Sequence, residues 1–231
     1  MLSIITVLGV LGLIGLAFRE NIREMWIMET LDDISYYVTN YQYYRSSSSY
    51  SQIQEKNNLL SQIKGEYAFN PDQNAIIANS LSTVGNYREA LSYFRDAYEG
   101  YKQKETLPNS VTYLAAYCYC SVLAGSGPDK PLGEFPVLKE KFSGEINSPY
   151  FAWLEGDLAL CRAVEASQNK DMDQTLAFLE EYHLHFQPTS FVYIKTIEHN
   201  LDYANNPDAR MTGILEKLYL KYQNEIKNYT Y

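Results

Sequence analysis

Two pairs of potential metal ligands are the first residues in this chain whose types and spacing suggest chemistry. Cys118 and Cys120 are two residues apart, and His183 and His185 repeat that spacing. Side chains two residues apart on a helix point about 200° away from each other, so neither pair could hold one ion without breaking its helix. Glu181 lies four residues before His185 and could share an ion with it, but no further histidine or cysteine is nearby. We therefore expect packing and capping roles, with no metal site and no cofactor.

The other patterns that could indicate an enzyme are incomplete. The segment Gly125–Lys130 has the composition of a phosphate-binding loop, but it lacks the required spacing and the following serine or threonine. The chain contains no nucleophile elbow, no HExxH and no dinucleotide-binding fingerprint. Cys161 brings the cysteines to three, an odd number without the spacing of a disulfide framework. We expect no catalytic residues.

The amino-acid composition argues against nucleic acid as a partner. The chain has 231 residues, enough for one ordinary domain and an anchor, and 28 acidic side chains against 19 basic ones. The net charge of -9 argues against a nucleic-acid partner, because such proteins need a basic face. The 22 tyrosines allow two interpretations. They either replace leucine and phenylalanine on half-buried helix faces or form a surface that binds proteins.

The N-terminal stretch Leu2–Phe18 predicts a single membrane-spanning helix. It has no charged residue, and its length meets the lower limit of about 17 residues for a span. No basic segment precedes it and no small-residue cleavage site follows it, so we expect a retained anchor. Arg19 and Arg23 follow the span while no basic residue precedes it, which favours a cytoplasmic body. A periplasmic or other extracytoplasmic body is the alternative.

A helix is expected to leave the membrane over residues 19–45. Its apolar residues follow the 4-3-4-3 spacing of a coiled-coil seam: Ile27, Leu31, Ile34, Val38 and Tyr41. This helix-pairing seam either packs on the first helices of its own domain or pairs with another membrane-bound helix in a homo- or hetero-oligomer. A further helix is expected over residues 50–64.

The stretch Pro71–Lys104 indicates two amphipathic helices joined by a turn at Gly85-Asn86. Small residues occupy three positions on these helices, at Ala78, Ala90 and Ala97. Bulky residues lie beside them: Ile77, Leu81, Tyr87, Leu91 and Phe94. This alternation of small and large residues resembles the tetratricopeptide repeat, a helix–turn–helix unit of about 34 residues. The closing proline of that repeat is absent, and the second helix is expected to continue until Pro108.

The resemblance implies an all-α, right-handed solenoid of three to four degenerate hairpins. Later helices are expected over the ranges 110–125, 137–142, 148–166, 171–185, 189–203 and 209–229. An inserted loop is expected at residues 125–136, where glycine and proline are frequent. The chain would then consist of an anchor (1–18), a juxtamembrane helical segment (19–65) and a repeat domain (66–231).

The resemblance also implies a concave face made by the first helix of each hairpin. Repeats of this type that hold the C-terminal carboxylate of chaperones use lysine and asparagine there. Asn79 matches one such position, but Ala75, Ala115, Ala116 and Tyr119 stand where the others would be. The carboxylate clamp is therefore missing. The expected peptide-binding groove is neutral and aromatic: Asn79, Ser82, Thr83, Thr112, Tyr119 and Val122.

These features predict a membrane-anchored interaction module that acts as a scaffold or assembly factor for a protein complex. The alternative is a structural or accessory subunit of a larger membrane assembly, held through the anchor and the helix-pairing seam. The sequence does not identify the protein partner in either case.

Overall fold

The computed structural model describes the backbone of residues 2–229 and the side chains of residues 18–225. Every regular element in this part of the chain is a helix, which confirms the predicted all-α class. The chain forms two compact units, Met1–Asn86 and Tyr87–Tyr231. The boundary directly follows the turn Gly85-Asn86, so the two helices of the predicted hairpin belong to different units.

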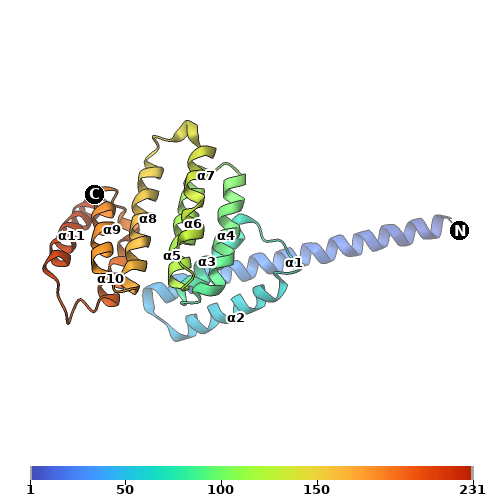
Figure 1. Cartoon of the computed structure of the whole chain (residues 1–231). Coiled ribbons are helices and arrows are strands. Elements are labelled where there is room, and N and C mark those ends of the chain that lie inside the picture. The colour runs from blue at the N-terminus through green and yellow to red at the C-terminus, as the bar shows by residue number, and fades with distance from the viewer. Residues whose placement is uncertain (1, 230–231) are drawn as a thin grey trace. The chain divides into compact units, whose positions relative to one another are not determined.

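The first unit contains three helices, and the two shorter ones pack against the long one (Figure 1). They are α1 (Leu2–Tyr44), α2 (Ser47–Ile63) and α3 (Pro71–Thr83). The serines at positions 46–49 separate α1 from α2 and begin α2, which Ser46 caps by accepting a hydrogen bond from the Ser49 amide. Asn70 and Gln73 form a reciprocal capping box at the start of α3.

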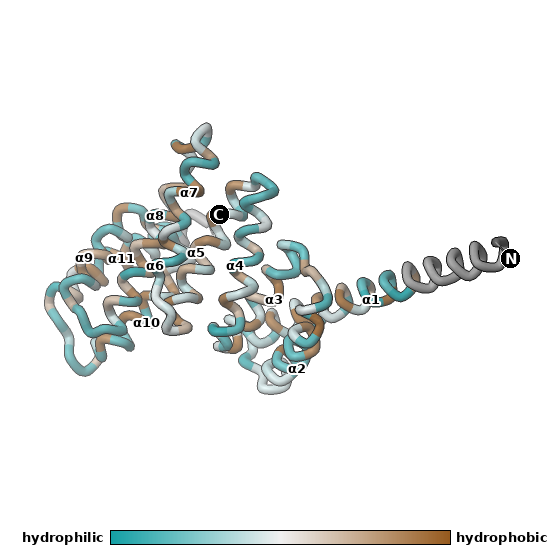
Figure 2. The backbone as a smooth tube through the Cα atoms, turned by 45° about the vertical axis from the view of Figure 1, so that its right-hand side comes forward, coloured by the Kyte–Doolittle hydropathy of each residue, from teal (hydrophilic) through white to brown (hydrophobic). Residues whose placement is uncertain are grey.

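The core of the first unit contains most of the helix-pairing seam. Ile27, Leu31 and Ile34 are fully buried, and Figure 2 shows hydrophobic residues gathered where α1, α2 and α3 meet. This burial is what the first interpretation of the seam requires, namely packing on helices of its own domain. The side chains of Val38 and Tyr41, one and two turns further on, are half-buried.

The second unit is a row of helices in which each main helix packs on the next. It contains α4 (Tyr87–Gln103), α5 (Leu107–Leu123), α6 (Asp129–Leu132), α7 (Glu134–Lys141), the 3-10 helix η1 (Ser143–Glu145), α8 (Pro149–Gln168), α9 (Met172–Leu184), the 3-10 helix η2 (Pro188–Phe191), α10 (Val192–Asn200) and α11 (Ala209–Tyr229). The packing order is α4, α5, α8, α9, α11, and α10 also packs on α8 (Figure 1). The predicted range of α11 is confirmed.

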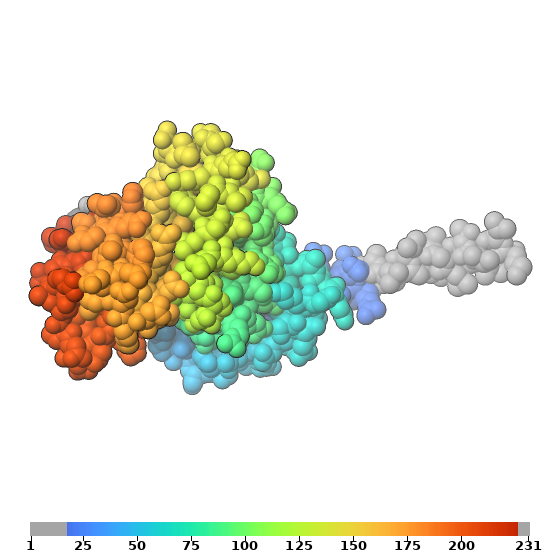
Figure 3. All heavy atoms as spheres, in the orientation of Figure 1, coloured from blue at the N-terminus to red at the C-terminus, as the bar shows by residue number. Residues whose placement is uncertain are grey.

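The segment 125–136 differs from the expected loop. After two turn glycines with positive φ, Gly125 and Gly127, the chain forms the short α6 and the beginning of α7. Glu134 at the start of α7 accepts a hydrogen bond from Tyr98 and forms an ion pair with Lys102 at 2.9 Å, which ties the segment to α4. These contacts stabilise helical turns that the glycines and prolines alone did not indicate. The α7–η1 segment forms the upper edge of this unit in Figure 3.

Helices α8 and α9 are separated by so little space at one point that only glycine fits. A Cβ atom on Gly156 would clash with the carbonyl oxygen of His185 and would lie 2.9 Å from its carbonyl carbon. Gly156 therefore lets the end of α9 approach the middle of α8, as a small residue at a helix crossing does.

No helix in the described part of the chain has the length and apolarity needed to cross a bilayer. Residues 2–17 of the predicted span lie outside the part whose side chains are described, although their backbone continues α1.

Candidate functional site

A cavity of about 410 Å³ opens in the second unit between α5, α8 and the η2–α10 segment. We call it the aromatic cavity. Its lining residues are Val111, Thr112, Ala115, Ala116, Tyr119, Tyr150, Trp153, Asp157, Gln187, Thr189, Ser190 and Tyr193.

The cavity exists because small side chains on α5 stand opposite large ones on α8. The α5 residues recur at the spacing of one helical face, and the middle of that face carries Ala115 and Ala116. On α8, Tyr150, Trp153 and Asp157 follow steps of three and four and so share a face. The space that two alanines leave empty is thus bordered by aromatic rings.

Two aromatic pairs form the walls. Tyr119 from α5 stacks on Tyr193 from α10, with ring centroids 3.9 Å apart and an angle of 11° between the ring planes. Tyr150 and Trp153 meet edge to face at 5.2 Å. Tyr119 is almost fully buried, whereas 39% of Trp153 is exposed. The cavity therefore has a buried inner wall and a partly exposed tryptophan, and such aromatic side chains offer contact area at a low entropic cost.

A single carboxylate, Asp157, lies at the floor. Ser190 and Tyr119 both donate hydrogen bonds to its Oδ1 atom, and the tyrosine hydroxyl is 3.5 Å away. Burial raises the pKa of Asp157 to about 6, while these two hydrogen bonds act in the opposite direction. Because that pKa is still below 7, the carboxyl group is mostly ionised at neutral pH.

The second oxygen of this carboxylate is open to the cavity. No described side chain or amide donates to Oδ2, and Asp157 forms no ion pair among the described residues. This oxygen is also not among the fully buried atoms that lack a partner, so it retains access to the cavity. A bound molecule could reach it with a hydrogen-bond donor.

The cysteines lie in the protein interior rather than in a reactive site. Cys118 donates a hydrogen bond to Cys161 across the α5–α8 contact, with the sulfur atoms 2.7 Å apart, and Cys120 donates to the carbonyl oxygen of Tyr87. All three are free thiols and buried. Burial raises the pKa of Cys120 to about 12 and that of Cys161 well above its usual range. Such thiols are poor nucleophiles, so the expectation of core packing is confirmed.

The predicted groove residues divide into two groups. Thr112 and Tyr119 line the aromatic cavity, whereas Val122 is buried one turn further along α5 and does not. The remaining three lie on α3 in the first unit, where the Ser82 and Thr83 hydroxyls both donate to the Asn79 carbonyl oxygen.

Sequence reasoning missed the carboxylate and most of the aromatic lining. One signal was present, because Asp157 lies three residues after Leu154 and four before Cys161 and so shares the apolar face of α8. A charged residue in the buried stripe of a helix is uncommon and marks a position with a specific partner. Nothing in the sequence indicated that Ser190 and Tyr193 would line the cavity, because their position depends on how η2 and α10 pack against α8.

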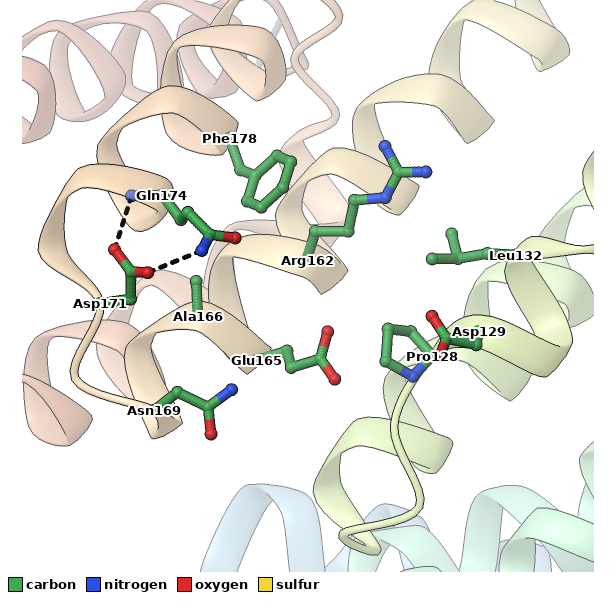
Figure 4. A pocket seen from close by; sticks show the side chains of 10 residues that line it. All are labelled: Pro128, Asp129, Leu132, Arg162, Glu165, Ala166, Asn169, Asp171, Gln174 and Phe178. Atoms are coloured by element: carbon green, nitrogen blue, oxygen red, sulfur yellow. Dashed lines mark hydrogen bonds between the residues drawn. The ribbon is translucent and has the colours of Figure 1, made fainter.

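A second cavity, of about 240 Å³, lies between α6, α8 and α9 (Figure 4). Its three carboxylates, from Asp129, Glu165 and Asp171, either cap a helix or lie close to another negative charge. Asp171 caps α9 by accepting hydrogen bonds from Gln174. Glu165 points toward Asp129, and burial together with that neighbouring charge raises the pKa of Glu165. The guanidinium of Arg162 lies 5.8 Å from the ring centre of Phe178.

His183 and His185, the two histidines considered as metal ligands, lie at the end of α9. His185 Nε2 is 3.9 Å from a carboxylate oxygen of Glu155, and burial together with Lys221 lowers the pKa of His183. Among residues 18–225, no group of three histidine, cysteine or acidic side chains is placed to hold a metal ion.

The aromatic cavity, with the buried carboxylate of Asp157, is therefore the candidate functional site in the described part of the chain. No protein-family model, no curated protein and no solved structure matches this chain.

Proposed function

We propose that this protein is a membrane-anchored interaction module, a scaffold or assembly factor that binds a segment of a partner protein in the aromatic cavity. The observation that carries the proposal is the cavity itself, which combines aromatic walls with a few polar side chains and a single carboxylate. Binding sites in proteins usually combine an apolar lining with a few polar groups that fix orientation.

The size of the cavity indicates how the partner would bind. A volume of about 410 Å³ accommodates one or two large side chains but not a whole helix. The partner would therefore insert an anchor residue, while its flanking backbone would lie along the exposed rim near Thr112 and Trp153. Buried anchors of this kind supply most of the binding energy in protein interfaces.

The arrangement of the second unit supports a tetratricopeptide-like solenoid as the scaffold of this site. The pairs α4–α5 and α8–α9 pack closely, and α5 packs on α8 between them. The small residues Ala90, Ala97 and Cys118 are fully buried in this unit. Such stacks present a concave surface to peptides.

The uncharged stretch 2–18 would tether this module to a membrane, with the body on the cytoplasmic side. A tether raises the local concentration of the binding site beside partners in the same membrane. The alternative function, a structural subunit held through the helix-pairing seam, has less support because Ile27, Leu31 and Ile34 are already buried within the first unit.

Photo-crosslinking tests the proposed function. The full chain, kept in mild detergent with its native partners, would carry a benzoylphenylalanine at Thr112 on the rim or at Ala177, an exposed residue of α9. We expect a discrete cross-linked product from position 112 and none from position 177.

The two tryptophans provide a matched control for the same experiment. Trp153 and Trp26 are equally exposed, at 39% and 38%, but only Trp153 lines the cavity. Trp153→Ala should remove the cross-linked product and Trp26→Ala should not. A product of unchanged yield in the Trp153 variant would rule out the aromatic cavity as the binding site.

A further inference from the structure

Resting on this proposed function, we infer that the aromatic cavity selects a cationic side chain of the partner, lysine or arginine, whose N–H group bonds Oδ2 of Asp157. The partner segment would thus be basic where it enters the cavity. The carboxylate clamp of related repeats would have the opposite preference, for a negatively charged chain end.

The hydrogen bonds of Asp157 leave one oxygen for a ligand. Ser190 and Tyr119 approach from η2 and α5, and both donate to Oδ1. This fixes the carboxylate plane and leaves Oδ2 without a donor among the described residues. A carboxylate oxygen accepts hydrogen bonds readily, and the strongest ones come from ammonium and guanidinium groups.

The charge of Asp157 is not compensated within the described part of the chain. The groups that interact electrostatically with it are Tyr119, Cys161, Tyr182 and Tyr193. Burial raises the pKa of each of these four groups, so all are neutral at pH 7 and none supplies a positive charge. A buried charge without a partner is unfavourable, and a bound cation would remove that penalty.

The walls of the cavity favour the same ligand. Four aromatic residues line the same cavity as Asp157: Tyr119, Tyr150, Trp153 and Tyr193. Cations are attracted to the faces of aromatic rings, most strongly to tryptophan and more strongly when water is excluded. The long methylene stem of lysine or arginine would pack against Ala115 and Ala116, which leave room for it.

Other ligand classes fit the cavity less well. An anionic side chain would be repelled by Asp157. A purely apolar side chain would cover Oδ2 and deprive it of water without offering a donor, and an unsatisfied buried acceptor is costly.

Trp153 provides a direct measurement of occupancy. The chain contains two tryptophans, so the full-length Trp26→Phe variant in detergent has Trp153 as its sole indole fluorophore. The probes are acetylated and amidated tripeptides with alanine on both sides of a central lysine, arginine, norleucine or citrulline. We expect the lysine and arginine probes to change Trp153 fluorescence saturably and to bind at least tenfold more tightly than the two neutral probes.

Variants of two carboxylates test whether Asp157 causes the preference for the lysine and arginine probes. Asp157→Asn should abolish the preference for the charged probes. Glu155→Gln removes a negative charge from the same helix, where Glu155 instead pairs with Lys139, and should preserve the preference. The comparison of lysine with norleucine in the unaltered cavity needs no change to Asp157, so it remains decisive even if Asp157→Asn unfolds.

The results separate this inference from the proposed function. If lysine and norleucine probes bind equally well, or if Asp157→Asn binds with unchanged preference, the cationic specificity is wrong while the cavity still binds peptides. If no probe changes Trp153 fluorescence and position 112 gives no cross-linked product, the proposed function itself fails.

Discussion

At the scale of single residues, Asp157 links the aromatic cavity to the stability of the fold. Its pKa is about 6 in the folded protein, against 3.8 as the ordinary value. Between pH 4 and 6 the folded state therefore binds more protons at this residue than the unfolded state does. Through this group, stability is highest below about pH 4, falls as the pH rises through 6, and is constant above that.

We predict that Asp157→Asn will be more stable relative to the unaltered protein at pH 7.5 than at pH 4.5. The difference between the two conditions should be about 2 kcal/mol, because the folded pKa lies about 1.5 units above pH 4.5 and one unit corresponds to about 1.4 kcal/mol. Denaturant unfolding of both proteins at the two pH values measures it. A pH-independent difference would contradict the raised pKa of Asp157.

The burial of several tyrosines supports the first interpretation of their abundance, in which tyrosine replaces leucine and phenylalanine in packing. Tyr93, Tyr98 and Tyr182 are buried core residues, and burial raises the pKa of Tyr93 to about 12. Tyr43 and Tyr44 at the end of α1 are each 78% exposed. Tyrosine thus serves as a packing residue at these buried positions, whereas protein binding by other tyrosines stays a prediction.

At the scale of helices, the crossing of α8 and α9 depends on the missing side chain of Gly156. The obstacle to a larger residue is the backbone of His185, which cannot move aside as a flexible side chain could. Because Asp157 is the next residue, a shift of α8 here would also move the floor of the aromatic cavity.

We predict that Gly156→Ala will destabilise the protein by about 1–3 kcal/mol, the usual cost of overpacking, and will weaken peptide binding. Gly213→Ala is the matched control, since Gly213 lies in the second turn of α11 and nothing is within 4 Å of a Cβ atom built there. That control should gain up to about 1 kcal/mol from the higher helix propensity of alanine. Thermal or chemical unfolding of both variants tests the prediction, which fails if the two glycines respond alike.

Three residues of the helix-pairing seam lie in the core of the first unit. A mutation there would therefore change the stability of the unit as well as any pairing with another helix. Replacing Ile34 by aspartate would place a charge in an apolar core and would disrupt folding whether or not α1 had a partner helix. A milder truncation separates the two effects.

We predict that Ile34→Ala will cost about 2–5 kcal/mol in stability, as truncation of a buried isoleucine does. Tyr36→Ala changes a residue of α1 that is 65% exposed and should alter stability by no more than about 0.5 kcal/mol. Urea unfolding distinguishes the two. Equal effects would mean that α1 does not pack on α2 and α3 as described.

At the scale of the whole molecule, the compact units do not follow the predicted repeat. The stretch 71–104 resembles one helix–turn–helix unit, yet α3 packs with α1 and α2 whereas α4 packs with α5. The groove inferred from successive repeats is therefore split, and only its Thr112 and Tyr119 portion belongs to the aromatic cavity.

The membrane anchor is a prediction for the complete chain. We expect the full-length protein to remain in the membrane pellet after alkaline carbonate extraction and a variant lacking residues 2–18 to become extractable. The reason is the transfer energy of seventeen uncharged residues into the bilayer. Replacing the stretch with a leucine–alanine sequence of equal length should restore retention. Extraction of the full-length protein would contradict the anchor.

The sequence by itself determined the helical class and several helix ends, but the helix predicted to continue until Pro108 ends at Gln103. Pro71, Pro108 and Pro149 lie in the first turns of α3, α5 and α8, and Gly85 and Gly125 follow the ends of α3 and α5. These signals are local, because proline lacks an amide hydrogen and glycine tolerates positive φ. The alternating small and large residues likewise identified buried positions such as Ala90 and Phe94.

Only the tertiary structure decided which residues meet. Tyr119, Asp157, Ser190 and Tyr193 are spread over more than seventy residues and come together because α5, η2 and α10 all contact the same region around α8. The helices α6 and α7 likewise depend on contacts such as that between Glu134 and Lys102. A helical periodicity shows which face of a helix is buried but not which helix covers it. The partner of each face is chosen by side-chain complementarity over the whole unit.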